Sequence, residues 1–187
     1  GKRYFISAYI WYRQRAHVAS QIPEIASEDP LGAARLLYGF AEAFDKWVPT
    51  FDVAWNNHPL DFSAGPPYRY WGGLWSRWSP SDLGYDFKNV ANAYKIVQET
   101  NAFEVLSQEV GEDVETKLIE EMFEPSIDYH RSFPVFNNNV EFNKALGLIS
   151  LGEALRDSSY IHEAIEWVVN YTPNIYLFDG FYRETTV

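Results

Sequence analysis

Hydrophobic residues recur along most of the chain at the three- or four-residue spacing of an α-helix. The spacing predicts a first helix over residues 3–19, which the polar, Pro-containing stretch 20–30 should end. A second helix is predicted to begin at Pro30, because the first turn of a helix does not need the backbone N–H that proline lacks. Its apolar stripe consists of Leu31, Ala34, Leu37, Tyr38, Ala41 and Phe44.

Residues 49–80 interrupt this pattern with a long stretch that is rich in Pro, Gly and aromatic residues and has no helical period. Long irregular segments in compact domains are usually functional or disordered, and the many Trp and Tyr side chains argue against disorder. Shorter helices are predicted near 102–109 and 113–124. Before them, helical spacing returns on Leu83, Phe87, Val90, Tyr94 and Val97.

Residues 142–155 stand out because apolar side chains cover almost every side of the predicted helix. A helix of this kind is buried all round. Gly147 and Gly152 each cost it on the order of 1 kcal/mol relative to Ala, which indicates that another helix backbone packs close to them. The next helix, 159–171, is amphipathic. Its inward residues are predicted to be Ile161, Ala164, Ile165 and Val168, and its outward ones Glu163, Glu166 and Asn170.

A buried helix joined by a short turn to a half-exposed helix is typical of two concentric layers of antiparallel helix hairpins. The fold expected for residues 1–187 is therefore all-α, an incomplete α/α toroid with too few helices to close a ring. Only residues 174–186 carry a strand-like pattern.

Composition narrows the classes of function. The formal charge of −11 argues against nucleic-acid binding and mildly against any polyanionic ligand. The absence of cysteine excludes disulfides, zinc–thiolate sites and thiol nucleophiles, and we expect neither a metal nor a cofactor. No apolar run approaches the about 20 residues that span a bilayer, so no membrane insertion is expected. Aromatic residues make up 18%, which suits either an aromatic core or stacking on sugar rings.

Three consecutive asparagines, Asn137, Asn138 and Asn139, precede the apolar helix. One Asn suffices to cap a helix, because its side-chain oxygen accepts a backbone N–H of the first turn. The other amides could then donate hydrogen bonds to a sugar hydroxyl or a carboxylate. The run therefore either caps the helix only or also contacts a ligand. His130 and Arg131, just upstream, have the same two explanations, structural or ligand-binding.

Three stretches, taken together, resemble the heparinase II/III-like and alginate-lyase-like polysaccharide lyases. They are the Asn-rich helix start with "ALGLISLGEALRDSSYIHEAI", the segment "DGFYRE", and "LLYGFAEAFDKWVPTF" with the Trp-Gly-Gly loop and "DLGYDFKNVANAYKIV". Together they cover about residues 30 to 187.

The resemblance implies β-elimination of an acidic, uronic-acid-containing polysaccharide by a periplasmic or secreted enzyme with an incomplete toroid and β-domains. It implies that Asn137, Asn138, Asn139 and His130 serve the chemistry, the asparagines by neutralising the uronate carboxylate. The residues it places against substrate are Arg131, Trp71, Trp75, Arg77, Trp78, Tyr182, Arg183 and Glu184.

One departure concerns the Tyr-His pair that follows "DGFYRE" in that family, since no such pair stands between "DGFYRE" and Val187. We therefore expect this chain to be one part of a larger enzyme, with the remaining toroid, the β-domains and the general base elsewhere in the same protein. Two alternatives stay open. One is an α/α-barrel glycoside hydrolase with Asp179 and Glu184 as its carboxylate pair, and the other is a non-catalytic carbohydrate-binding helical module.

Overall fold

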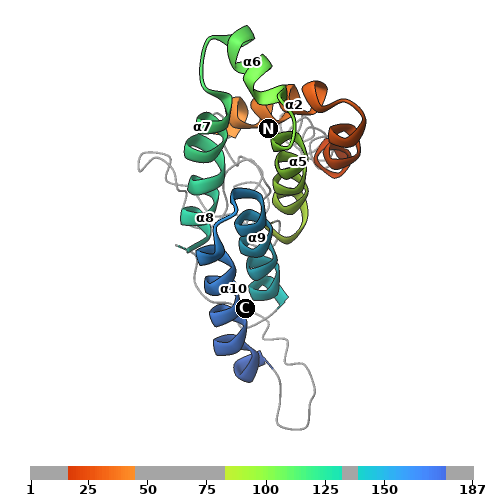
Figure 1. The fold of residues 1–187 in the computed structure, drawn as a ribbon. Coiled ribbons are helices and arrows are strands. Elements are labelled where there is room, and N and C mark those ends of the chain that lie inside the picture. Colours follow the sequence, from red (N-terminus) through yellow and green to blue (C-terminus); the bar gives the residue numbers. More distant parts are fainter. Residues whose placement is uncertain (1–16, 45–82, 132–138, 176–187) are drawn as a thin grey trace, which may run out of the picture.

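A computed structural model describes residues 17–44, 83–131 and 139–175, and within these ranges the protein is all-α, with no strand. Residues 17–28 form the first described helix. The others are α2 (Pro30–Phe44), α5 (Lys88–Gln98), α6 (Ala102–Val110), α7 (Val114–Leu118), α8 (Glu124–Arg131), α9 (Asn139–Leu155) and α10 (Ser158–Ile175) (Figure 1). Two π-helical turns, η2 (Leu83–Phe87) and η3 (Ile119–Phe123), lead directly into α5 and α8.

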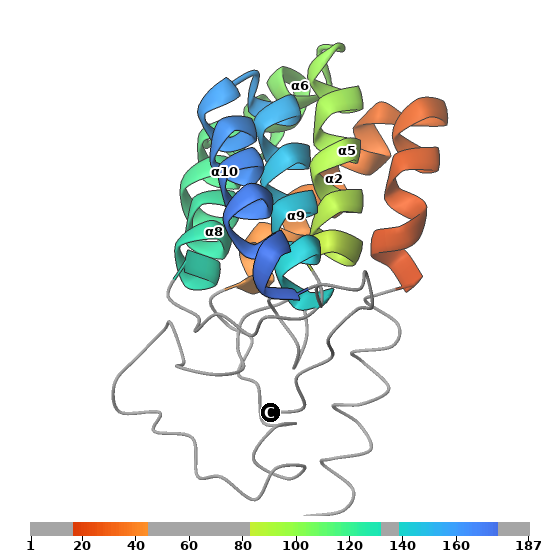
Figure 2. The same cartoon turned by 90° about the horizontal axis from the view of Figure 1, so that it is seen from below.

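The helices pack in a continuous order of neighbours. α10 lies against α9, α9 against α5 and η2, and α5 against α2, which in turn contacts α6, α7 and η3. Figure 2 shows α10, α9 and α5 side by side. This row places the start of α9 between η2, which precedes it by more than fifty residues in the chain, and α10, which follows it.

α5 and α9 run parallel to one another. Near their starts, Gly84 of η2 lies against Asn143, and further along Lys95 forms an ion pair of 3.1 Å with Glu153. At the far end Arg156 pairs with Glu99. α10 returns antiparallel to α9, since Gly152 contacts Ile161 while Trp167 reaches back to Glu141. The unit is thus two parallel helices with an antiparallel return.

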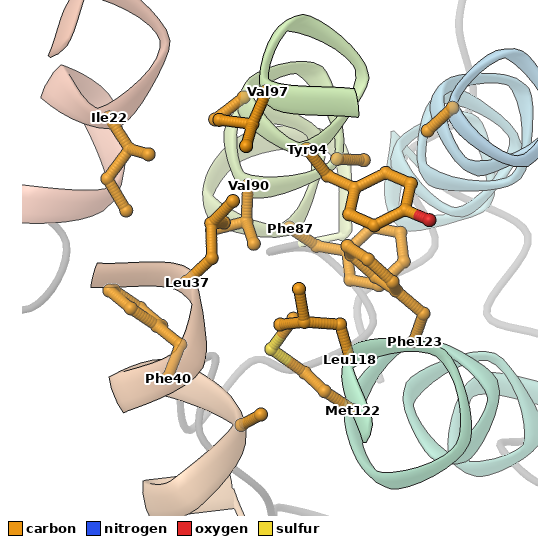
Figure 3. Packing of buried hydrophobic residues seen from close by; sticks show 14 of the residues in the cluster. Ile22, Leu37, Phe40, Phe87, Val90, Tyr94, Val97, Leu118, Met122 and Phe123 are labelled. Atoms are coloured by element: carbon orange, nitrogen blue, oxygen red, sulfur yellow. The ribbon is translucent and has the colours of Figure 1, made fainter. Parts of the chain in front are cut away.

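Aromatic rings from four elements form the centre of the core. Tyr94 of α5 lies 5.2 Å from Phe103 and 5.3 Å from Phe123, measured between ring centroids. Phe87 of η2 meets Phe123 edge-to-face at 5.6 Å, and all four rings are buried. Figure 3 shows Phe87, Tyr94 and Phe123 gathered in this core. Edge-to-face pairs are favourable beyond the area they bury. Part of the high aromatic content of the chain therefore serves to fill the hydrophobic core.

Several predictions from the sequence are confirmed. The second helix begins at Pro30, and the predicted stripe along η2 and α5 is buried at Phe87, Val90, Tyr94 and Val97. Gly152 does lie against another helix backbone, because a Cβ placed there would come within 3.2 Å of the backbone nitrogen of Ile161 in α10.

The predicted break at residues 20–30 is wrong. The helix continues through Pro23 to residue 28, and only Asp29 interrupts it before α2. Ala19, Ile22 and Ala26 are spaced three and four apart and are each 0% exposed. Burial of that stripe outweighs the lost hydrogen bond at the proline. The predicted helix 113–124 likewise continues as helical backbone to Arg131.

Two predictions about the last hairpin also need correction. α9 is not buried all round, because Leu146 is 42% exposed on the side that no described helix covers. Ile165 of α10, predicted to face inward, is 54% exposed. Its neighbour Ala164 faces α9 instead, and one residue further along a helix turns the side chain by about 100°.

Candidate functional site

Buried polar side chains are concentrated at the first turns of α9. Glu141 is 1% exposed, Asn143 8% and Lys144 0%, although the helix is otherwise mainly apolar. Full burial of a lysine is rare unless the ammonium is paired, because transfer of a charge out of water is costly. This part of α9 is therefore the strongest candidate for a site among the described residues.

Glu141 and Lys144 form an ion pair one helical turn apart. Nζ of Lys144 lies 3.4 Å from Oε1 of Glu141, and Nε1 of Trp167 donates a hydrogen bond of 2.7 Å to Oε2. The same ammonium lies 5.1 Å from the centroid of the Trp167 ring, within the range of a cation–π contact. Burial lowers the pKa of Lys144 below its ordinary value, while the Glu141 carboxylate opposes that shift. A carboxylate in the first turn also suits the positive end of the helix dipole.

The turn η2 closes the other side of this region. A Cβ placed on Gly84 would come within 2.6 Å of Oδ1 of Asn143, so glycine permits the contact. Asp86 of the same turn is 8% exposed. π-Helical turns are rare and frequently occur at functional sites. Both η2 and α10 thus pack against the start of α9, η2 through Gly84 and α10 through Trp167.

Most of the residues that the sequence nominated lie outside the described ranges. Asn139 is the first residue of α9, and His130 lies in the last turn of α8. Outside the described residues are Asn137, Asn138, Trp71, Trp75, Arg77, Trp78, Asp179, Tyr182, Arg183 and Glu184. Their proximity to one another therefore stays a prediction.

Arg131 is held by two carboxylates. Its Nε and second terminal nitrogen donate to the two oxygens of Glu163, at 3.0 and 2.6 Å, and its other terminal nitrogen donates to Asp128 at 3.0 Å. These bonds raise the pKa of the guanidinium further above its ordinary value. Glu163, predicted to face water, is half-buried in this bridge. Three of the five N–H donors of the guanidinium are used in these bonds, and the side chain is 42% exposed.

The sequence-based candidates did not include Glu141, Lys144, Trp167 or Asp86. A signal was available, because Glu141, Lys144 and Leu148 are three and four residues apart and share one face with buried apolar residues. Charged residues on the buried face of an apolar helix indicate a paired or functional group.

A second region, at the corner between α6 and α7, is an open and acidic hollow. Glu104, Glu112, Asp113 and Glu115 line it together with Phe103, Ser107, Gln108 and Gly111. Its carboxylates would repel a uronate, and the described residues contain no group of three His, Cys, Asp or Glu able to hold a metal. The start of α9 is the better candidate.

Comparisons with protein-family models, with curated proteins and with solved structures find no match to this chain. Among the described helices, none combines the length and apolar character needed to cross a membrane.

Proposed function

We propose that this chain belongs to a polysaccharide lyase that cleaves a uronic-acid-containing polysaccharide by β-elimination, in the periplasm or outside the cell. The observation that carries the proposal is the set of buried polar groups on the first turns of α9, directly after the three asparagines. The carboxylate and the ammonium are buried and paired with one another, so they can fix the helix start whose amides would hold a polar ligand.

The arrangement of the helices supports the same proposal. In a toroid of helix hairpins, the inner helices run parallel to one another and each is followed by an antiparallel outer helix. α5 and α9 have the first relationship, and α9 and α10 have the second. We therefore propose an incomplete α/α toroid, completed by the rest of the same protein.

The chemistry requires removal of a proton from the carbon next to the uronate carboxylate. That carboxylate must accept more negative charge as the proton leaves, and preorganised hydrogen-bond donors stabilise the transition state. Amide groups of Asn137, Asn138 and Asn139 would donate to the carboxylate, and His130 would serve as a proton-transfer group. We propose that the general base that takes this proton, and the tyrosine that protonates the leaving glycosidic oxygen, lie elsewhere in the same protein, where the lyases that this chain resembles have a Tyr-His pair.

The first experiment uses the complete protein that carries this chain, with alginate, heparan sulfate, chondroitin sulfate and hyaluronan as substrates. Each β-elimination creates a carbon–carbon double bond conjugated to the carboxylate, so we expect ultraviolet absorbance to rise together with the number of new reducing ends. New reducing ends without absorbance would instead establish a hydrolase. Sugar binding with neither product would establish a binding module, and either result overturns the proposal.

The second experiment replaces Asn138 and Asn139 together with Ala. Loss of preorganised donors should lower kcat by about 100-fold or more, while loss of a helix cap should cost only about 1 kcal/mol of unfolding free energy. Thermal unfolding followed by circular dichroism provides the stability measurement. Wild-type activity in the variant would show that these asparagines only cap α9.

A further inference from the structure

Glu141 and Lys144 form an ion pair that is buried away from solvent. The side chains are 1% and 0% exposed, and they lie on α9 between the apolar residues that contact the neighbouring helices. Replacement of a buried ion pair by apolar groups of similar volume is often neutral or stabilising. Stability alone therefore does not account for an ion pair at this position.

The two oxygens of Glu141 are bound to two different elements. Oε1 faces Lys144 on the next turn of α9, and Oε2 accepts the Trp167 N–H from the middle of α10. Lys144 in turn faces the ring of the same tryptophan. Hydrogen bonds are directional, whereas apolar contacts permit small rotations, so this triangle fixes how the first turn of α9 is rotated against α10.

We propose that Glu141, Lys144 and Trp167 form a positioning cluster that aims the polar start of α9 at the uronate carboxylate. The inference rests on the proposed function. Asn139 lies two residues before Glu141 on the same helix, so a rotation of this turn would also move the backbone of Asn139. All three residues act through the groups at the helix start and none is a catalytic residue.

The test variant is the double substitution Glu141→Gln with Lys144→Met. Gln keeps a neutral oxygen acceptor for the Trp167 N–H, so that donor is not left unpaired, and Met retains most of the length of the lysine. The charge-assisted strength of that hydrogen bond and the contact of the Lys144 ammonium with the Trp167 ring are both lost, so the hold on the rotation of α9 is weakened. We expect this variant to fold with unchanged or higher thermal stability. Because the loss concerns orientation in the transition state, kcat on the active polymer should fall about 10- to 100-fold with little change in KM.

A second variant, Trp167→Phe, keeps a ring over Lys144 but removes the N–H donor to Glu141. We expect kcat to fall in the same way, and this result decides the inference if the double variant does not fold. Val169→Ala is the matched control on the same helix, since Val169 is 64% exposed, and it should retain wild-type kcat.

The outcomes separate this inference from the proposed function. A wild-type protein that yields no ultraviolet-absorbing product overturns both. An active wild-type protein, together with folded variants of Glu141, Lys144 and Trp167 that keep its kcat, overturns the positioning cluster and leaves the lyase intact.

Discussion

Gly84 and Asn143 lie in contact although fifty-nine positions separate them in the chain. A Cβ placed on Gly84 would come within 2.9 Å of the Cα of Asn143, a backbone atom that cannot move by a change of rotamer. The contact joins η2 to the early turns of α9, where the buried polar groups are. The glycine therefore sets how closely two elements of the candidate site approach.

Gly84→Ala should separate η2 from α9. Overpacking of a tight contact typically costs about 1 to 3 kcal/mol, and we expect that loss of unfolding free energy in urea titrations. Gly39→Ala is the matched control, because nothing lies within 4 Å of a Cβ placed there. The control should be neutral or stabilising by up to about 1 kcal/mol, since Ala has the higher helix propensity. Equal effects of the two substitutions would contradict the close approach.

Helix type and the buried stripes could be predicted from spacing alone. Phe87, Val90, Tyr94 and Val97 are three and four residues apart, and each is buried as that period requires. Which faces of a helix are covered by neighbouring helices could not be predicted in the same way. Leu146 and Ile165 are as hydrophobic as their buried neighbours, and their exposure depends on which helices stand beside α9 and α10. Local sequence does not carry that information.

The sequence nominated the start of α9 as a candidate site but none of the buried groups that the structure shows there. The asparagine run indicated the start of α9, and buried polar groups are found on the turns that follow. The partner of Glu141 is Trp167, twenty-six residues further along and on another helix, so its role depends on how α10 folds back. Contacts of that kind follow from tertiary packing.

The buried phenol of Tyr94 should make the protein sensitive to alkali. Its hydroxyl donates to Glu115 at 3.1 Å, and burial, together with that carboxylate, raises its pKa above the ordinary value of 10.0. The unfolded chain therefore ionises first, so this contribution to stability is complete below pH about 10 and is lost as the pH rises towards the folded pKa.

Tyr94→Phe keeps the ring against Phe103 and Phe123 and removes the ionisable group. We expect a loss of about 1 kcal/mol near neutral pH and a shallower decline of stability above pH about 10, measured as urea midpoints across a pH series. If the stability of the variant falls above pH about 10 as steeply as that of the wild type, ionisation of other groups dominates the loss of stability in alkali.

The strength of the ion pair between Arg131 and Glu163 should depend on the two N–H groups that the guanidinium donates to the two oxygens of one carboxylate. Arg131→Lys retains the charge but cannot donate two parallel bonds to one carboxylate, and a loss of about 0.5 to 1 kcal/mol is expected for this partly exposed pair. Arg35→Lys provides the comparison, because Arg35 contacts Glu109 with side chains that are 53% and 44% exposed. The change at Arg35 should be smaller, and the opposite order would contradict a bridge that ties α8 to α10.

Gly111 ends α6 in a left-handed conformation, with φ of 79°, and its N–H donates to the carbonyl of Ser107 at 2.9 Å. Nothing lies within 4 Å of a Cβ placed there, so any cost of substitution comes from the backbone and not from packing. Gly111→Ala should reduce the unfolding free energy by about 1 kcal/mol, while Gly111→Asn should cost less because Asn tolerates this conformation. Thermal melts of the three proteins should rank Gly above Asn above Ala. An alanine variant as stable as wild type would show that the corner between α6 and α7 does not need the left-handed residue.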